Sequence, residues 1–117
     1  MQTRKMIQIT QKDHIKLAIL QANKIVINEV QDIVDLIGNA HYQGACRLVV
    51  REEHLHPDFF DLKTGFAGEI LQKFSTYNFN LTILGSFEKY ASKSLRDFIY
   101  ESNKAGRIKF LENEETN

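Results

Sequence analysis

The stretch FFDLKTGFAGEILQKF, residues 59–74, carries the strongest helical pattern in the chain. From Pro57 onward, apolar residues recur at steps of three and four, as on the buried stripe of an amphipathic helix. The stripe comprises Phe59, Leu62, Phe66, Ile70, Phe74 and Tyr77. The pattern predicts a helix with one face in the core.

A strand, a helix and a final strand are expected after this helix. Residues 81–84 are apolar and β-branched and end at Gly85, which favours a strand. Ser92 or Ser94 is suited to cap a helix that stops at Ala105 and Gly106. Its apolar face would hold Leu95, Phe98, Ile99 and Ser102, and Ile108 alternates with Phe110 in a last strand.

Four more elements, a strand, a helix and the two strands of a hairpin, are expected before residue 57. The run 46–50 suits a central strand covered on both faces. Asn28, with Gln31 three residues later, suits the start of a helix that ends at Gly38 and Asn39. Alternating apolar residues predict a hairpin that turns at residues 11–13; they are Ile7, Ile9, Ile15, Leu17 and Ile19.

The order is therefore strand, strand, helix, strand, helix, strand, helix, strand. Helices between the later strands imply parallel crossovers, and the opening hairpin adds an antiparallel edge. We expect a single α/β domain over residues 1–117, with a mixed four- to five-stranded sheet, about three helices and a polar tail from about residue 112.

Composition narrows the classes of function. Lys plus Arg and Asp plus Glu number 15 each, so no net positive charge favours a nucleic acid partner. No apolar stretch is long enough to suggest a membrane span, and the N-terminus lacks a signal-peptide pattern. Cys46 is the only cysteine, and we expect it to be buried and reduced. These features predict a cytoplasmic protein.

Long motifs resemble a known family. The stretches FFDLKTGFAGEILQKF, LTILGSF and SKSLRDFIYESNK resemble a small bacterial family catalogued as a domain of unknown function, from about Glu29 to Phe110. That resemblance implies a fold family and no activity.

A second resemblance concerns the segment that opens the main helix. A strand, then DLKTGFAGEIL, then a strand ending in Gly85 is similar to the STAS family of anti-sigma-factor antagonists. The resemblance implies an STAS-like sheet and a regulatory module, with Asp61 and Thr64 at the positions of the family's acid and phosphorylatable hydroxyl. This chain has Thr for Ser and one residue more between the two.

One candidate site follows, composed of Asp61, Lys63, Thr64, Gly65, Gly68 and Glu69. A phosphate on Thr64 would lie where helix N–H groups favour negative charge. Alternatively, Thr64 only caps the helix, and the glycines allow close packing. We expect a non-catalytic binding or regulatory module that engages a protein partner here.

The alternative site is a rim after the central strand, composed of Arg51, Glu53, His54, His56 and Asp58, with Lys63 beside it. The carboxyl ends of parallel strands commonly bind ligands, which suggests a small-molecule-binding protein or a weak enzyme. No HExxH spacing is present, so a solvated loop also explains the segment. No grouping carries a complete catalytic mechanism, and we expect no metal, no cofactor and no catalytic residue.

The adjacent Phe59 and Phe60 suggest a second partner. Neighbouring residues on a helix cannot both face the core, so one of the two rings would remain for another surface. A homodimer is a possible consequence.

Overall fold

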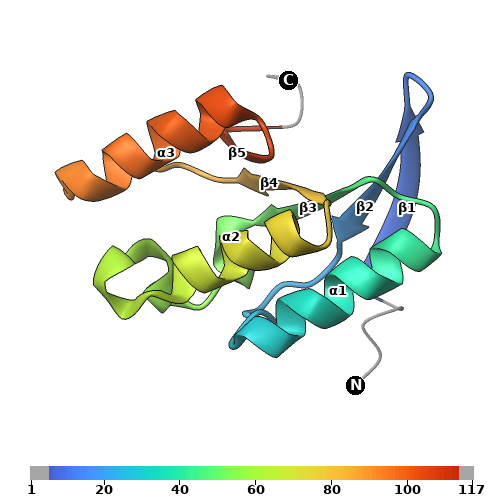
Figure 1. Cartoon of the computed structure of the whole chain (residues 1–117), viewed down its shortest axis with the longest axis horizontal. Helices are drawn as coiled ribbons and strands as arrows, with labels where there is room; N and C mark the ends of the chain where they lie inside the picture. The colour runs from blue at the N-terminus through green and yellow to red at the C-terminus, as the bar shows by residue number, and fades with distance from the viewer. Residues whose placement is uncertain (1–5, 114–117) are drawn as a thin grey trace.

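A computed structural model describes residues 6–113 as one mixed sheet with helices (Figure 1). The strands are β1 (Ile7–Lys12), β2 (Ile15–Leu20), β3 (Arg47–Arg51), β4 (Asn80–Leu84) and β5 (Ile108–Leu111). The helices are α1 (Val30–Tyr42), α2 (Phe66–Thr76) and α3 (Lys93–Ala105), with short 3-10 turns η2 (Glu52–His54), η3 (Pro57–Phe60) and η4 (Leu62–Thr64). Beyond Asn113, the expected polar tail lies outside the described residues.

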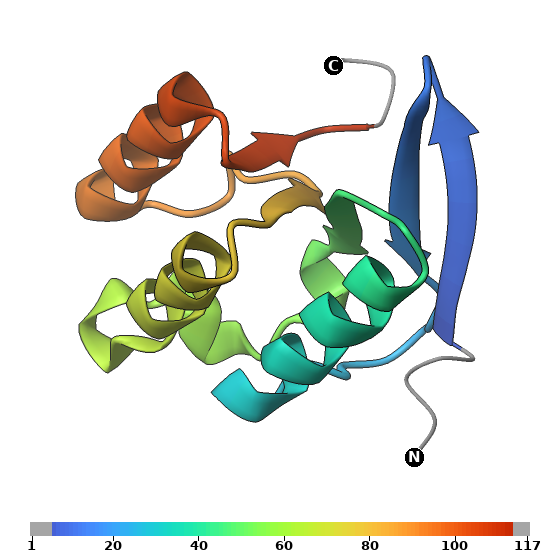
Figure 2. The ribbon, with the colours of Figure 1, turned by 45° about the vertical axis from the view of Figure 1, so that its right-hand side comes forward.

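The strands follow one another in the sheet in the order β1-β2-β3-β4-β5. β1 pairs with β2 antiparallel, and every later pair is parallel. Right-handed crossovers between successive neighbours place all connecting helices on one face, and Figure 2 shows α1, α2 and α3 together on one side of the strands. The predicted α/β class, the hairpin and the three helices are confirmed.

The core lies between this face of the sheet and the helices. Alternate strand residues point into it: Ala18, Leu20, Leu48, Val50, Leu81, Ile83, Ile108 and Phe110. The helices α1 and α2 cover them with Ile33, Leu36, Ile37, Ala40, Ala67, Ile70 and Phe74. These buried positions repeat every two residues in strands and every three or four in helices, as the two geometries require.

The hairpin turns later than predicted. Gln11 and Lys12 belong to β1, and the turn falls on Asp13 and His14. Both turn residues have positive φ, 52° and 71°, as in the type I′ turns that match the twist of paired strands. Asp tolerates this conformation better than most residues.

The helix α1 begins and ends later than predicted. Glu29, not Asn28, precedes it, and the Asp32 carboxylate accepts hydrogen bonds from the N–H groups of Asn28 (2.9 Å) and Glu29 (3.0 Å). Gly38 lies inside the helix, which continues to Tyr42. The left-handed residue that follows is Gly44, with φ of 91°.

The central strand departs from expectation at Cys46 but is buried on both faces, as expected. Cys46 precedes β3 and is exposed, so the prediction of a buried thiol is wrong. Val49 faces away from the helices yet is only 4% exposed. Its neighbours in the adjacent strands, Ile19 and Thr82, flank it in the register.

The main helix is shorter than its stripe suggested. Residues 57–64 form two 3-10 turns instead, because Gly65 adopts a left-handed conformation (φ 80°) that separates them from α2. Phe59 is still fully buried, from η3, whereas Tyr77 ends α2 and is 50% exposed. Apolar spacing therefore located the buried Phe59, Ile70 and Phe74 but neither the exposure of Tyr77 nor the helix boundary.

The α3 segment agrees with its prediction. The hydroxyl of Ser92 accepts a hydrogen bond from the N–H of Leu95 at 3.1 Å, and the helix ends at Gly106, with φ of 92°. Within residues 6–113, no helix has the length and apolar character needed to cross a membrane.

Phe60 is half-buried against its own chain. Its ring stacks on Tyr90 with centroids 4.9 Å apart and planes 11° apart, and it lies 6.1 Å from Phe87. The turn η3 lets Phe59 enter the core while Phe60 meets the β4–α3 loop. The neighbouring rings therefore no longer argue for a homodimer.

Candidate functional site

The segment that leads into α2 is held by short-range hydrogen bonds from side chains to backbone. The Nδ1 atom of His56 accepts from the N–H of Asp58 at 3.0 Å, at the start of η3. The Asp61 carboxylate accepts from the N–H of Lys63 at 3.3 Å, at the start of η4. Each turn is thus capped by the residue before it, as Asx-type turns are.

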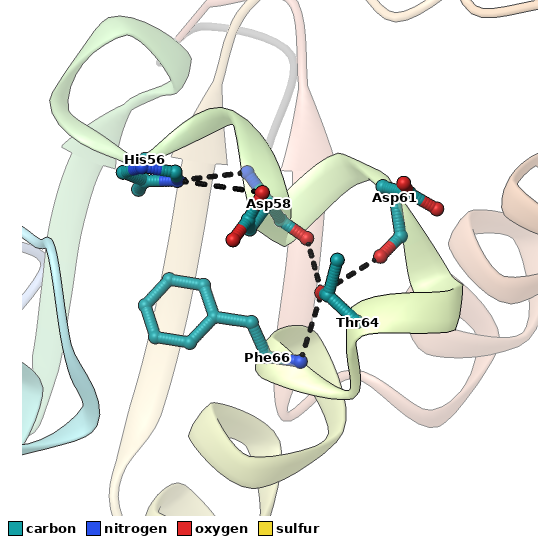
Figure 3. Close-up of polar contacts among 5 residues, drawn as sticks. All are labelled: His56, Asp58, Asp61, Thr64 and Phe66. Atoms are coloured by element: carbon teal, nitrogen blue, oxygen red, sulfur yellow. Dashed lines mark hydrogen bonds and ion pairs between the residues drawn. The ribbon is translucent and has the colours of Figure 1, made fainter.

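The Thr64 hydroxyl connects these turns (Figure 3). Its Oγ1 atom lies 2.8 Å from the carbonyl oxygen of Asp58 and 2.9 Å from that of Asp61, which share its proton. It also accepts from the N–H of Phe66 at 3.2 Å, so it caps α2. A phosphate here would remove the donated proton and put negative charge against two carbonyl oxygens. This conformation therefore disfavours phosphorylation of Thr64.

The two glycines of the segment differ. Gly65 has φ of 80°, a conformation that L side chains rarely adopt, and it ends η4 immediately before α2. Gly68 has ordinary helical geometry, and a Cβ added there would meet nothing within 4 Å. Backbone conformation explains Gly65, whereas neither conformation nor close packing within the described chain explains Gly68.

All six residues of the first candidate site are exposed and lie on one short stretch of chain. We name this set the helix-start surface; it comprises Asp61, Lys63, Thr64, Gly65, Gly68 and Glu69. Among residues 6–113, its three charged side chains form no ion pair. Its charges are therefore accessible to a partner.

The rim residues do not form one site. His54 is fully buried: its Nδ1 accepts from the N–H of Arg51 at 3.0 Å, so Nε2 carries the proton and donates to the carbonyl of Ala22 at 2.7 Å. Both ring nitrogens are thereby used within the fold. His54 ties the end of β3 to the segment after β2.

Of the remaining rim residues, His56 and Asp58 contact each other, with Nδ1 of His56 3.7 Å from Oδ1 of Asp58. The ring of His56 meets that of Phe66 edge-on, with centroids 6.5 Å apart, and Glu53 and Asp58 are exposed. Arg51 lines a cavity of about 70 Å³ that includes none of the other rim residues. In the described part of the chain, no group of three or more His, Cys, Asp or Glu residues could hold a metal ion.

Glu52, which belongs to neither candidate site, lies at the carboxyl end of β3. Its side chain, 14% exposed, accepts from Nζ of Lys89 at 2.7 Å, the N–H of Ser86 at 2.9 Å and the hydroxyl of Tyr90 at 2.9 Å. The strand register places Glu52 beside Gly85. β3 and β4 pair Arg51 with Leu84, so the next residues, Glu52 and Gly85, oppose each other.

Gly85 is required by this arrangement. A Cβ on residue 85 would lie 2.5 Å from Oε1 of Glu52. The glycine thus makes room for the carboxylate, which joins η2 to the β4–α3 loop.

Electrostatics keep Glu52 charged and Tyr90 neutral. Burial by itself raises the pKa of Glu52, but hydrogen bonds from Lys89, Ser86 and Tyr90 and the charge of Lys89 outweigh it and lower the pKa below its ordinary value. Burial, then the hydrogen bond to Glu52 and its charge, raise the pKa of Tyr90 to about 12. A carboxylate ionised and paired in this way is suited to hold a loop, not to donate a proton near neutral pH.

Comparisons with known proteins give a family and no activity. Searches of curated proteins and of solved structures found no match. They give no support to the resemblance to STAS domains. One family model, described as "Domain of unknown function (DUF4180)", matches residues 12–117, a longer range than the resemblance had covered. The chain therefore belongs to this family of α/β domains.

Proposed function

We propose that the protein is a non-catalytic binding module that engages a protein partner through the helix-start surface. The observation that carries the proposal is Gly68. Glycine in a helix is less stable than alanine by up to about 1 kcal/mol, and no atom of residues 6–113 lies within 4 Å of a Cβ placed there to explain the glycine by close packing. A partner that approaches the helix closely at this position would explain the missing side chain.

The surrounding charges support recognition of a polar partner. Asp61 and Glu69 flank Lys63, and all three are exposed without an ion pair in the described chain. Because Thr64 fixes the turns before α2, the surface is held in one shape. Such preorganisation reduces the entropy lost on binding. The proposal therefore rests on a rigid surface rather than on a phosphorylation switch.

The side-chain chemistry offers little to a catalytic alternative. The Thr64 hydroxyl is bonded to backbone groups, His54 is buried with both nitrogens bonded, and Glu52 is paired. The cavity that Arg51 lines includes none of the other residues of the rim that would serve a small-molecule enzyme. We therefore favour binding over catalysis.

The test exchanges the charges of the surface. The double variant Lys63→Glu with Glu69→Lys keeps the net charge, and we expect it to lose proteins that the wild type captures from the native host's lysate. The matched control exchanges Glu101 and Lys104 on α3, which are 68% and 64% exposed. Circular dichroism confirms that each variant is folded. Identical sets of captured proteins for the wild type and both variants would refute the proposal.

A further inference from the structure

The face of the sheet away from the helices is formed by side chains of the strands. Register and alternation place Thr10, Leu17 and Arg47 side by side on this face, because the neighbouring Ala18 and Leu48 point into the core. Within residues 6–113, no helix lies on it (Figure 2). Strand side chains therefore form its surface.

A hollow of about 320 Å³ opens on this face. We name it the sheet hollow; it is lined by Lys12, Asp13, Ile15, Leu17, Arg47 and Lys109. Its volume is near the lower end of the range of about 300–1,000 Å³ found for small-molecule sites. Residues from the hairpin, from β3 and from β5 meet there.

Arg47 gives the hollow a fixed cation. Its Nη1 donates to the carbonyl of Leu81 at 2.8 Å and to Oγ1 of Thr82 at 3.0 Å, and its Nη2 donates to the carbonyl of Gly106 at 3.1 Å. All three acceptors are neutral, and no carboxylate of the described residues lies within ion-pair distance. Buried and half-buried charges are normally paired. Arg47 is therefore held by three hydrogen bonds and has no counter-ion among residues 6–113.

Two lysines increase the positive charge. Lys12 ends β1 and Lys109 lies in β5, at the opposite edge of the sheet, and neither is in an ion pair within the described residues. Asp13 is the one acid among the lining residues. The hollow is thus net positive in a chain whose total charge is zero.

The other lining residues are apolar. Ile15, 47% exposed, and Leu17 present aliphatic surface beside the cations. We infer that the sheet hollow binds a small organic anion, with its carboxylate or phosphate near Arg47 and Lys109 and its apolar body on Ile15 and Leu17. The inference does not depend on the proposed function, since the helix-start surface follows the other end of β3.

Other occupants fit less well. A second copy of the chain would bring three cations of each hollow toward those of the other, with only Asp13 to offset them. A single nucleic acid strand would favour aromatic rings for stacking, and the lining has none. A small anion satisfies both the unpaired charge and the aliphatic wall.

The test follows backbone amide signals by NMR while a probe is added at low salt. The probes are octanoate, octyl phosphate, inorganic phosphate and, as the neutral control, octanol. We expect at least one of the two amphiphilic anions to shift signals of residues 12–17, 47 and 109, with weaker binding of inorganic phosphate and no binding of octanol there. Octanol binding as tightly as octanoate, or shifts confined to other regions, would overturn the inference.

Variants locate the charge. We expect Lys109→Glu to weaken binding roughly tenfold or more, since it removes one charge-assisted contact and adds a repulsion. Lys12→Glu, at the exposed end of β1, is a second variant that should also weaken binding. Lys24→Glu, which follows the carboxyl end of β2 and lies outside the hollow lining, is the control and should not. The same spectra show whether each variant is folded. Equal affinity in all three variants and the wild type would refute the site.

Discussion

The helix-start surface and the sheet hollow differ in how the chain builds them. The six residues of the surface lie within positions 61–69, and the hydrogen bonds of this segment join residues two to six positions apart. The hollow brings together residues 12, 47 and 109 from three strands. The first is therefore local and fixed by turn chemistry, whereas the second exists only when the sheet has its native register.

The two regions also lie at opposite ends of β3. The segment leading to the helix-start surface follows the carboxyl end of β3, where open α/β sheets commonly bind ligands, but there Glu52 fills the space beside Gly85. The hollow instead lies near the amino ends of β2, β3 and β5, on the face without helices. The rule that ligands bind at the carboxyl ends of strands therefore pointed to the end of β3 that Glu52 fills, and not to the end that carries the hollow.

The largest expected loss of stability comes from Phe59, which anchors the turns before the helix-start surface in the core. Phe59→Ala should lower the free energy of unfolding by about 3–5 kcal/mol, because a fully buried ring leaves a cavity. Urea denaturation measures it, with Tyr42→Ala, at a residue 81% exposed, as the matched aromatic control. A loss no larger than the control's would mean that the turns before α2 do not depend on Phe59.

The next effect tests the contact between Glu52 and Gly85. Gly85→Ala should destabilise by about 1–3 kcal/mol, because the new Cβ would force the carboxylate from its hydrogen bonds. The double variant that also carries Glu52→Ala should lose less stability than the sum of the losses of the two single variants, because the two residues are in contact. Strict additivity in this double-mutant cycle would show that the residues act independently.

The two glycines of the helix-start surface should respond in opposite directions. Gly65→Ala should lose about 1–2 kcal/mol of stability, the penalty of a left-handed residue with a Cβ. Gly68→Ala should be neutral or gain up to about 1 kcal/mol, since open space surrounds it. Thermal and urea unfolding measure both, and similar losses at the two positions would contradict the assignment of Gly68 to binding.

A smaller, conditional effect is expected from acid. The pKa of Glu52 is lowered in the folded protein, so its contribution to stability is complete above the ordinary value of 4.5 and is lost as the pH falls through the folded-state pKa. The stability difference between wild type and Glu52→Gln should therefore be constant near neutral pH and shrink on acidification. A difference that grew as the pH fell would reverse the assigned sign.

The smallest effect on stability is expected in the sheet hollow. Lys109→Glu should change the free energy of unfolding by no more than about 0.5 kcal/mol, since Lys109 forms no ion pair in the described chain. The same variant should lose affinity for the amphiphilic anion, as measured by NMR. A large loss of stability would mean that Lys109 supports the fold rather than a ligand.

Sequence patterns gave the elements more reliably than their boundaries. The alternation at Ile7 and Ile9 and the cap at Ser92 predicted their strand and helix correctly, since both depend on near neighbours. The start of α2 was placed wrongly because apolar spacing continues through η3 and η4, and only the left-handed Gly65 interrupts the helix. The direction of side chains was harder to predict than the element boundaries. His54, for example, was expected on a ligand-binding rim but is buried.

The sequence alone determined the α/β class, the order of elements and the polar character of the helix-start surface, because each follows from periodicity or turn chemistry within a few residues. The tertiary structure decided that Glu52 meets Gly85, that Phe60 stacks on Tyr90 and that Lys12, Arg47 and Lys109 share one hollow. The physical reason is that these contacts depend on strand register and sheet twist, which many distant residues set together.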